Sequence, residues 1–192
     1  MTAVQNADSI LTGTSGSEAP RRGVAGDWAV QPKDFTFYAV KYINPWHGYY
    51  LRRGKDVITG KNGNTSLDDT IVRHEEYVED DEVNMLTTYS LNEIEFPLVF
   101  KDGEGGNIDC SLILAFDEEG NCTVSPGSGD YTATGTGKFV SKGEKKSWGN
   151  QDRDAIYVSY EIDLDEIHVE ATDTLVMRNR GVTMELFTPT LE

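Results

Sequence analysis

The sequence predicts an all-β domain whose strands follow one another as an antiparallel meander. The first observation is residues 153–164, where the apolar side chains occupy every second position: Ile156, Val158, Tyr160, Ile162 and Leu164. A side-chain period of two is typical of a strand that buries one face. The second observation is that this pattern recurs along most of the 192 residues, and the third is that no long segment shows a helical period.

The expected strands are marked by alternation, or by β-branched and aromatic residues, between turn-forming segments. In chain order they cover residues 35–43, 49–58, 70–78, 83–91, 94–100, 111–117, 122–125, 131–140, 153–164, 167–171, 175–178 and 182–187.

Turn chemistry separates the first of these strands. Pro45 and Gly48 stand between the first two strands, because proline fixes φ and glycine allows positive φ. Further along, the acidic run 79–82 separates residues 70–78 from residues 83–91. The β-branched and aromatic content there favours two strands over a helix beginning at Ser66.

The middle strands carry two further signals. Pro97 points away from the apolar face of residues 94–100, which indicates an edge or a bulge because proline has no N–H to donate. Glu119-Gly120 lies between two short apolar runs and is typical of a hairpin turn.

Two architectures satisfy these short strands in a mostly up-and-down order: a lipocalin-like antiparallel meander β-barrel and a two-sheet β-sandwich. The barrel is our first expectation. Residues 1–25 are rich in small polar residues and predict a flexible N-terminal segment, so that residues 26–192 form a single β-barrel domain.

The charge balance excludes several classes of partner. The chain has 33 acidic and 17 basic residues, a net charge of -16, which repels nucleic acid and anionic membrane surfaces. It also has no membrane-spanning segment, since no stretch approaches about 20 apolar residues. The N-terminus shows no basic start followed by an apolar run, so we expect the leader to be absent from this chain, with Met1 either a natural start or a start that replaces a removed leader.

The sequence indicates no cofactor, no metal site and no catalytic motif. Residues 135–138 lack the spacing of a phosphate loop, and the three histidines, His47, His74 and His168, lie in different expected elements. The acidic runs do not match a calcium loop. Cys110 and Cys122 are expected to be free thiols, with at least one of them in the core.

Aromatic residues beside arginines are the best ligand-binding candidates. Trp46, Tyr49 and Tyr50 precede Arg52, and Trp148 stands in a polar loop before Arg153. Exposed rings with hydrogen-bonding neighbours suit the apolar faces and hydroxyls of sugars. The alternative is that these rings close the ends of a barrel or pack under loops.

Several strings together resemble the C-terminal domain of uncharacterised Bacteroidetes-type surface lipoproteins linked to glycan utilisation. The similarity spans about residues 35–187, and its most specific strings are residues 37–44, 47–56, 137–140, 145–149, 153–157 and 173–178. The resemblance implies a lipocalin-like barrel that follows a lipid-anchored, immunoglobulin-like domain, with export to the cell envelope, at the outer surface or in the periplasm.

These observations lead to three expectations for function. The first is a noncatalytic cell-envelope binding module, with a carbohydrate as ligand. The second is a lipocalin-like carrier of a small apolar ligand. The third is a hydrolase, because a pair of carboxylates could act on a glycosidic bond if the fold brought them together.

Overall fold

The computed structural model describes residues 13–32 and 41–183, and the chain forms two compact units, Met1–Lys41 and Tyr42–Glu192. In the first unit, β1 (Thr14–Ser15) pairs antiparallel with β2 (Trp28–Val30), which follows the 3-10 turn η1 (Ala25–Asp27). The segment predicted to be flexible therefore contributes residues 14–15 to a strand pair, while its residues 1–12 lie outside the described residues. The expected strands 35–43 and 182–187 also fall largely outside them.

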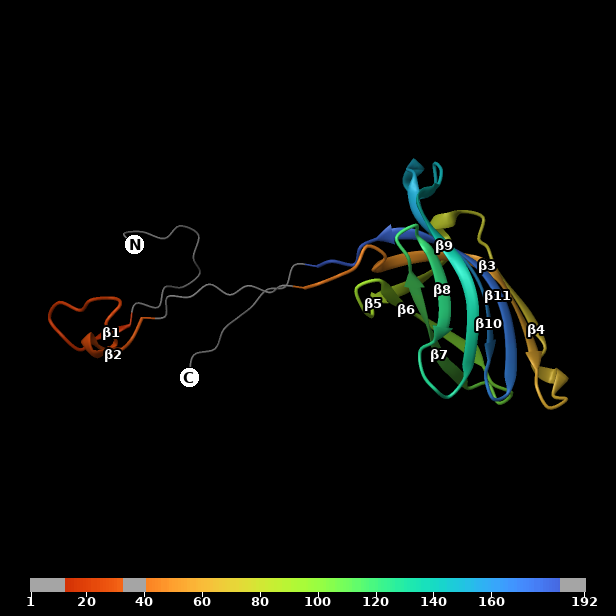
Figure 1. Ribbon diagram of the computed structural model, residues 1–192, viewed down its shortest axis with the longest axis horizontal. Coiled ribbons are helices and arrows are strands. Elements are labelled where there is room, and N and C mark those ends of the chain that lie inside the picture. Colours follow the sequence, from red (N-terminus) through yellow and green to blue (C-terminus); the bar gives the residue numbers. More distant parts are fainter. Residues whose placement is uncertain (1–12, 33–40, 184–192) are drawn as a thin grey trace. The chain divides into compact units, whose positions relative to one another are not determined.

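In the second unit, the strands of residues 41–183 form one antiparallel sheet that closes on itself (Figure 1). They are β3 (Gly48–Gly60), β4 (Asp69–Arg73), β5 (Glu82–Thr88), β6 (Glu93–Lys101), β7 (Asn107–Phe116), β8 (Asn121–Pro126), β9 (Thr132–Glu144), β10 (Arg153–Asp163) and β11 (Ile167–Asn179). Successive strands from β5 to β11 are neighbours, and β3 pairs with both β5 and β11. These eight strands form a closed barrel, which confirms the predicted lipocalin-like meander.

The core lies inside this barrel and follows the period of two. On β10 the five residues predicted to share a face are all buried: Ile156, Val158, Tyr160, Ile162 and Leu164. They pack with apolar side chains from the other walls, among them Phe96, Leu112 and Leu114. The two thiols are free, with Cys122 buried and Cys110 partly buried against the core.

β11 corrects the sequence prediction of two short strands at residues 167–171 and 175–178. It is one strand, and residues 172–174 keep their pairing with both β10 and β3. Asp173, which lies in the interval between the two predicted strands, points into the barrel and is buried there. A charged inward residue interrupts the apolar pattern without interrupting the backbone ladder.

One edge of β3 changes partner halfway along its length. Residues 48–52 pair with β5, and residues 54–58 pair with β4. Between them the chain leaves the sheet as the loop of residues 74–81, which contains the 3-10 turn η3 (Val78–Asp80). The predicted strand 70–78 is therefore too long, and its last residues belong to this loop.

β6 is paired with β5 only at its start. The register joins Thr87 to Glu95 and Thr88 to Ile94, and no later residue of β6 pairs with a described residue of β5. Pro97 follows this point, with its side chain on the exposed face. The expected edge is confirmed, since a proline there removes no hydrogen bond of the β5 ladder.

Candidate functional site

Trp46 and Tyr50 lie inside one end of the barrel. The Trp46 ring stacks on Phe116 with centroids 4.2 Å apart and meets Phe139 edge-on. Tyr50 is 0% exposed, and its hydroxyl donates a hydrogen bond to the Trp46 carbonyl at 2.8 Å. Because Tyr50 is wholly buried, it offers no surface for a sugar. The alternative interpretation, rings that close a barrel end, describes both residues.

The chain segment before β3 is tied to the same end of the barrel. The buried Asn44 amide donates to the carbonyls of Ser90 at 3.1 Å and Glu93 at 2.7 Å. From the other terminus of the barrel, the Arg180 guanidinium donates to the carbonyl of Asn44 at 2.6 Å and to that of Pro45. The points where the chain enters and leaves the barrel are thus bonded to each other.

Arg52 corrects a second prediction, because it lies in the barrel interior rather than on a binding surface. It is 2% exposed and forms ion pairs with Asp173 at 2.8 Å and with Asp56 at 3.2 Å. Its guanidinium also donates to the Tyr160 hydroxyl at 3.0 Å, and that hydroxyl donates to Asp173 at 2.8 Å. We refer to Arg52, Asp56, Asp173 and Tyr160 as the buried ion cluster.

Gly54 makes room for this cluster. It lies between Arg52 and Asp56 on the inward face of β3, and a Cβ atom at position 54 would overlap the Asp173 carboxylate. The phase of Arg52 with Tyr50 and the opposite charges of Arg52 and Asp56 were the sequence signals for an inward charge pair. Our reading of the sequence missed them.

Burial and pairing set the protonation of the buried ion cluster. Burial raises the pKa of Asp173, and the Arg52 guanidinium opposes that shift. Burial disfavours the charge of Arg52, but Tyr160, Asp173 and Asp56 together outweigh it and raise the Arg52 pKa. Burial also raises the pKa of Tyr160, so its hydroxyl keeps its proton and remains a donor.

Trp148, Arg153 and Tyr49 lie outside this interior network. The Arg153 guanidinium stacks 3.9 Å from the Trp148 ring centroid and donates to the Trp148 carbonyl at 3.3 Å. The Trp148 indole donates to the Met177 carbonyl on β11 at 3.2 Å. These contacts hold the loop between β9 and β10 against the barrel wall. Tyr49 is 39% exposed, which makes it the most exposed of the four aromatic residues predicted to bind a ligand.

The loop of residues 74–81 is held at its neck and exposed at its head. Arg53 forms an ion pair with the buried Asp81 and donates to the Glu75 carbonyl at 3.0 Å. Asp81 also accepts a hydrogen bond from the Glu75 amide at 3.0 Å. At the head, Tyr77 is 57% exposed and Glu76 is exposed beside it.

A cleft of about 340 Å³ lies between this head and the start of the β9–β10 loop. We call it the loop cleft. Tyr77 and Glu79 line one side, Lys145 and Lys146 line the other, and Arg53 also lines it. Two residues of β11, Thr174 and Val176, also line it. Tyr77 was missed as a site residue because the acidic residues around it were read as the end of a strand and a charged turn.

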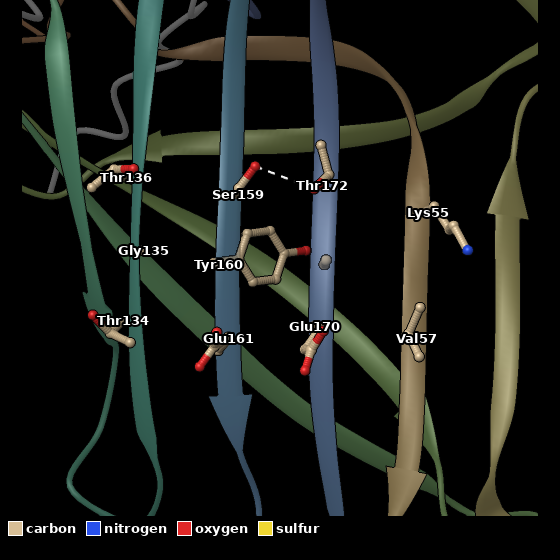
Figure 2. A pocket seen from close by; sticks show the side chains of 11 residues that line it. Lys55, Val57, Thr134, Gly135, Thr136, Ser159, Tyr160, Glu161, Glu170 and Thr172 are labelled. Atoms are coloured by element: carbon tan, nitrogen blue, oxygen red, sulfur yellow. Dashed lines mark hydrogen bonds between the residues drawn. The ribbon is translucent and has the colours of Figure 1, made fainter.

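A second hollow, of about 390 Å³, lies on the outer face of the barrel wall. We call it the strand groove, and Figure 2 shows its side chains on four neighbouring strands. Hydroxyls and charged groups line it: Lys55, Thr134, Thr136, Ser159, Glu161, Glu170 and Thr172. The Ser159 and Thr172 hydroxyls are 3.2 Å apart and hydrogen-bonded. Its surface can offer donors and acceptors to a polar ligand.

Among residues 13–32 and 41–183, no three His, Cys, Asp or Glu side chains gather closely enough to hold a metal ion. The helices in those ranges include none long and apolar enough to cross a membrane. The second unit is thus an antiparallel β-barrel with a buried ion cluster inside, and the hollows on its outer wall include the loop cleft and the strand groove.

Residues 45–181 match the model of the family described as Domain of unknown function (DUF5627), and the chain belongs to this family. A crystal structure of a structural-genomics protein of unknown function from Bacteroides ovatus is 47% identical, with a TM-score of 0.75. The similarity covers 93% of this chain and 56% of that one, so the chain spans little more than half of that relative's length. No curated protein matches. The Bacteroides relative is consistent with the Bacteroidetes part of the resemblance.

Proposed function

We propose that the barrel is a noncatalytic glycan-binding module and that the loop cleft is its sugar site. The observation that carries this proposal is the exposed Tyr77 ring beside hydrogen-bonding side chains from two loops. A sugar ring presents an apolar face that packs on an aromatic ring and hydroxyls that bond to polar and charged groups. Tyr77 supplies the ring, and Glu79, Lys145 and Lys146 supply acceptors and donors.

The packing of the interior favours this function over that of a carrier for a small apolar ligand. Large side chains fill the barrel, and Tyr50, Phe96 and Leu112 are each 0% exposed. The buried ion cluster adds charges to the same interior, where an apolar ligand would leave them unpaired. The loop cleft and the strand groove open instead on the outer wall.

We further propose that the protein acts in the cell envelope as part of a lipid-anchored surface protein. Support comes from the resemblance to Bacteroidetes-type surface lipoproteins and from a relative in Bacteroides ovatus whose chain is longer than this one. Cell fractionation with surface proteolysis of the full-length protein tests this. We expect it in the outer-membrane fraction and accessible to protease; recovery in the cytosol would contradict the proposal.

The sugar site is tested by affinity electrophoresis through gels that contain soluble β-glucan, xylan, mannan, α-glucan or polygalacturonate. We expect at least one polymer to retard the protein, and calorimetry with that polymer to give its affinity. Replacing Tyr77 with alanine should weaken binding roughly tenfold, about 1.4 kcal/mol.

The matched control is Tyr89→Ala, which removes a ring that is 63% exposed and outside the cleft. It should bind as the unchanged protein does. The proposal is overturned if no polymer retards the protein, or if Tyr77→Ala and Tyr89→Ala bind equally well.

A further inference from the structure

The loop cleft and the strand groove are adjacent stretches of the same two strands. On β3 and β11, Arg53 lies opposite Thr174 and lines the loop cleft, and the next outward pair, Lys55 and Thr172, lines the strand groove. Residues two apart on a strand share a face and are about 6.7 Å apart. The two hollows are therefore neighbours on the outer wall, and we call the stretch of wall that contains both of them the track.

The track is long compared with a single sugar ring. From Val176 in the loop cleft to Glu170 in the strand groove it follows six residues of β11, which is about 20 Å at 3.3–3.4 Å per residue. The strand groove also extends sideways over β10 and β9, where Ser159 lies opposite Thr136 (Figure 2). Hydrogen-bonding groups are thus available well beyond the reach of a single sugar ring that stacks on Tyr77.

The charges along the track favour a neutral ligand. The lining includes cations such as Arg53 and Lys55 and anions such as Glu161 and Glu170, so neither sign dominates. The whole chain carries a net charge of -16, which repels a polyanion at long range. A chain of uncharged sugars meets no such repulsion and can bond to groups of either sign.

We propose that the ligand is a neutral, linear glycan whose successive sugar units lie along the track, with one unit on Tyr77 and the following units over the strand groove. This inference rests on the proposed glycan-binding function and adds the class of glycan and its direction on the barrel. Under this inference, Ser159 and Thr172 contact the distal units of the glycan, although neither residue reaches the unit on Tyr77.

The test uses fragments of two, four and six units from the neutral polymer that retards the protein. Calorimetry should show affinity rising with length, by roughly tenfold from two units to six. In Ser159→Arg, a bulky side chain occupies the strand groove from an exposed position. This variant should reduce six-unit affinity to that of the two-unit fragment and leave two-unit affinity unchanged.

The control is Ser128→Arg, which makes the same change at an exposed serine that lines neither hollow. It should bind every fragment as the unchanged protein does. Equal affinity for two and six units, or an unaltered length dependence in Ser159→Arg, would overturn the linear-glycan inference and leave the sugar site standing. Retardation by polygalacturonate alone would also overturn the linear-glycan inference, because that polymer is charged. Absence of binding to every polymer would overturn the proposed function and this inference together.

Discussion

Arg52 and Arg53 are consecutive residues that hold the same loop from opposite faces of the barrel wall. Arg52 points inward and contacts Glu82 at 3.9 Å, where the loop of residues 74–81 returns to the sheet. Arg53 points outward and binds Asp81, one residue earlier. The exposed head that carries Tyr77 is therefore fixed to the barrel by two charges that follow each other in the sequence.

These two arginines should differ in their contribution to stability. Arg52→Met leaves Asp173 buried without its cation and leaves Asp56 paired with Arg73 alone, and we expect a loss of about 3–5 kcal/mol in the free energy of unfolding. Arg53→Met removes the cation of the buried Asp81, but that carboxylate keeps its hydrogen bond from the Glu75 amide. We therefore expect a smaller loss, about 1–2 kcal/mol. Urea denaturation of both variants measures the difference. Equal losses would show that the buried ion cluster stabilises the fold no more than the pair of Arg53 and Asp81 does.

Gly54 should tolerate no side chain. In Gly54→Ala the added methyl group overlaps the Asp173 carboxylate and the Thr172 carbonyl, so the cluster or the β3–β11 pair must shift. We expect a loss of about 1–3 kcal/mol, the usual cost of overpacking a core. Gly129→Ala is the control, because a Cβ atom there meets nothing within 4 Å. Thermal unfolding should separate the two variants; a stable Gly54→Ala protein would show that the cluster can rearrange.

The success of the fold prediction and the wrong placement of Arg52 have one cause. Alternation on β10 reports burial correctly because its inward residues are apolar. The same alternation continues through Arg52 on β3 and Asp173 on β11. A charged residue at an inward position is read as exposed, however, because the sequence does not show the partner that neutralises its charge. The two residues are 121 positions apart by number, and only the closure of the barrel by β3 and β11 brings them together.

Alkaline pH should destabilise the protein through its buried thiol. Burial raises the pKa of Cys122 from 9.0 to about 11. Between these values the unfolded chain releases the thiol proton while the folded chain keeps it, so stability falls as pH rises, by up to about 1.4 kcal/mol per pH unit. Below pH 9 this contribution is fully present. Above the folded pKa, it has been lost.

Cys122→Ala tests this pH dependence. The variant loses packing at every pH, but it should lose less stability than the unchanged protein between pH 9 and pH 10.5. Urea denaturation at several pH values gives both curves. Curves that stay parallel across this range would show that the thiol keeps its ordinary pKa in the folded state.

Arg180 should control how firmly the end of the barrel is closed. Arg180→Gln removes charge-assisted hydrogen bonds to the carbonyls of Asn44 and Pro45, and we expect about 1.5–3 kcal/mol of local stability to be lost. Hydrogen exchange at the Trp46 and His47 amides should become faster. Arg178→Gln, an exposed change two residues earlier near the end of β11, should leave these rates unchanged. Equal acceleration in both variants would exclude a specific closure by Arg180.

The candidate site was less accessible from the sequence than the fold. The Trp148 loop was correctly singled out as a loop beside the barrel, but Trp148 supports that loop through Arg153 and Met177 and does not line the cleft. Tyr77 was read as part of a strand because β-branched residues precede it. Its exposure depends on the change of partner by β3, from β4 to β5, and no local pattern records such a change.

The bond between Arg180 and Asn44 also sets how the barrel carries mechanical load. Tension between the chain before residue 44 and the chain after residue 180 would peel β11 from β3, breaking their ladder a few hydrogen bonds at a time. Tension between that end of the barrel and a polymer bound along the track would instead pull parallel to β3 and β11. That load would be shared by the whole ladder at once, so the barrel would resist a pull from its ligand better than a pull between its own termini.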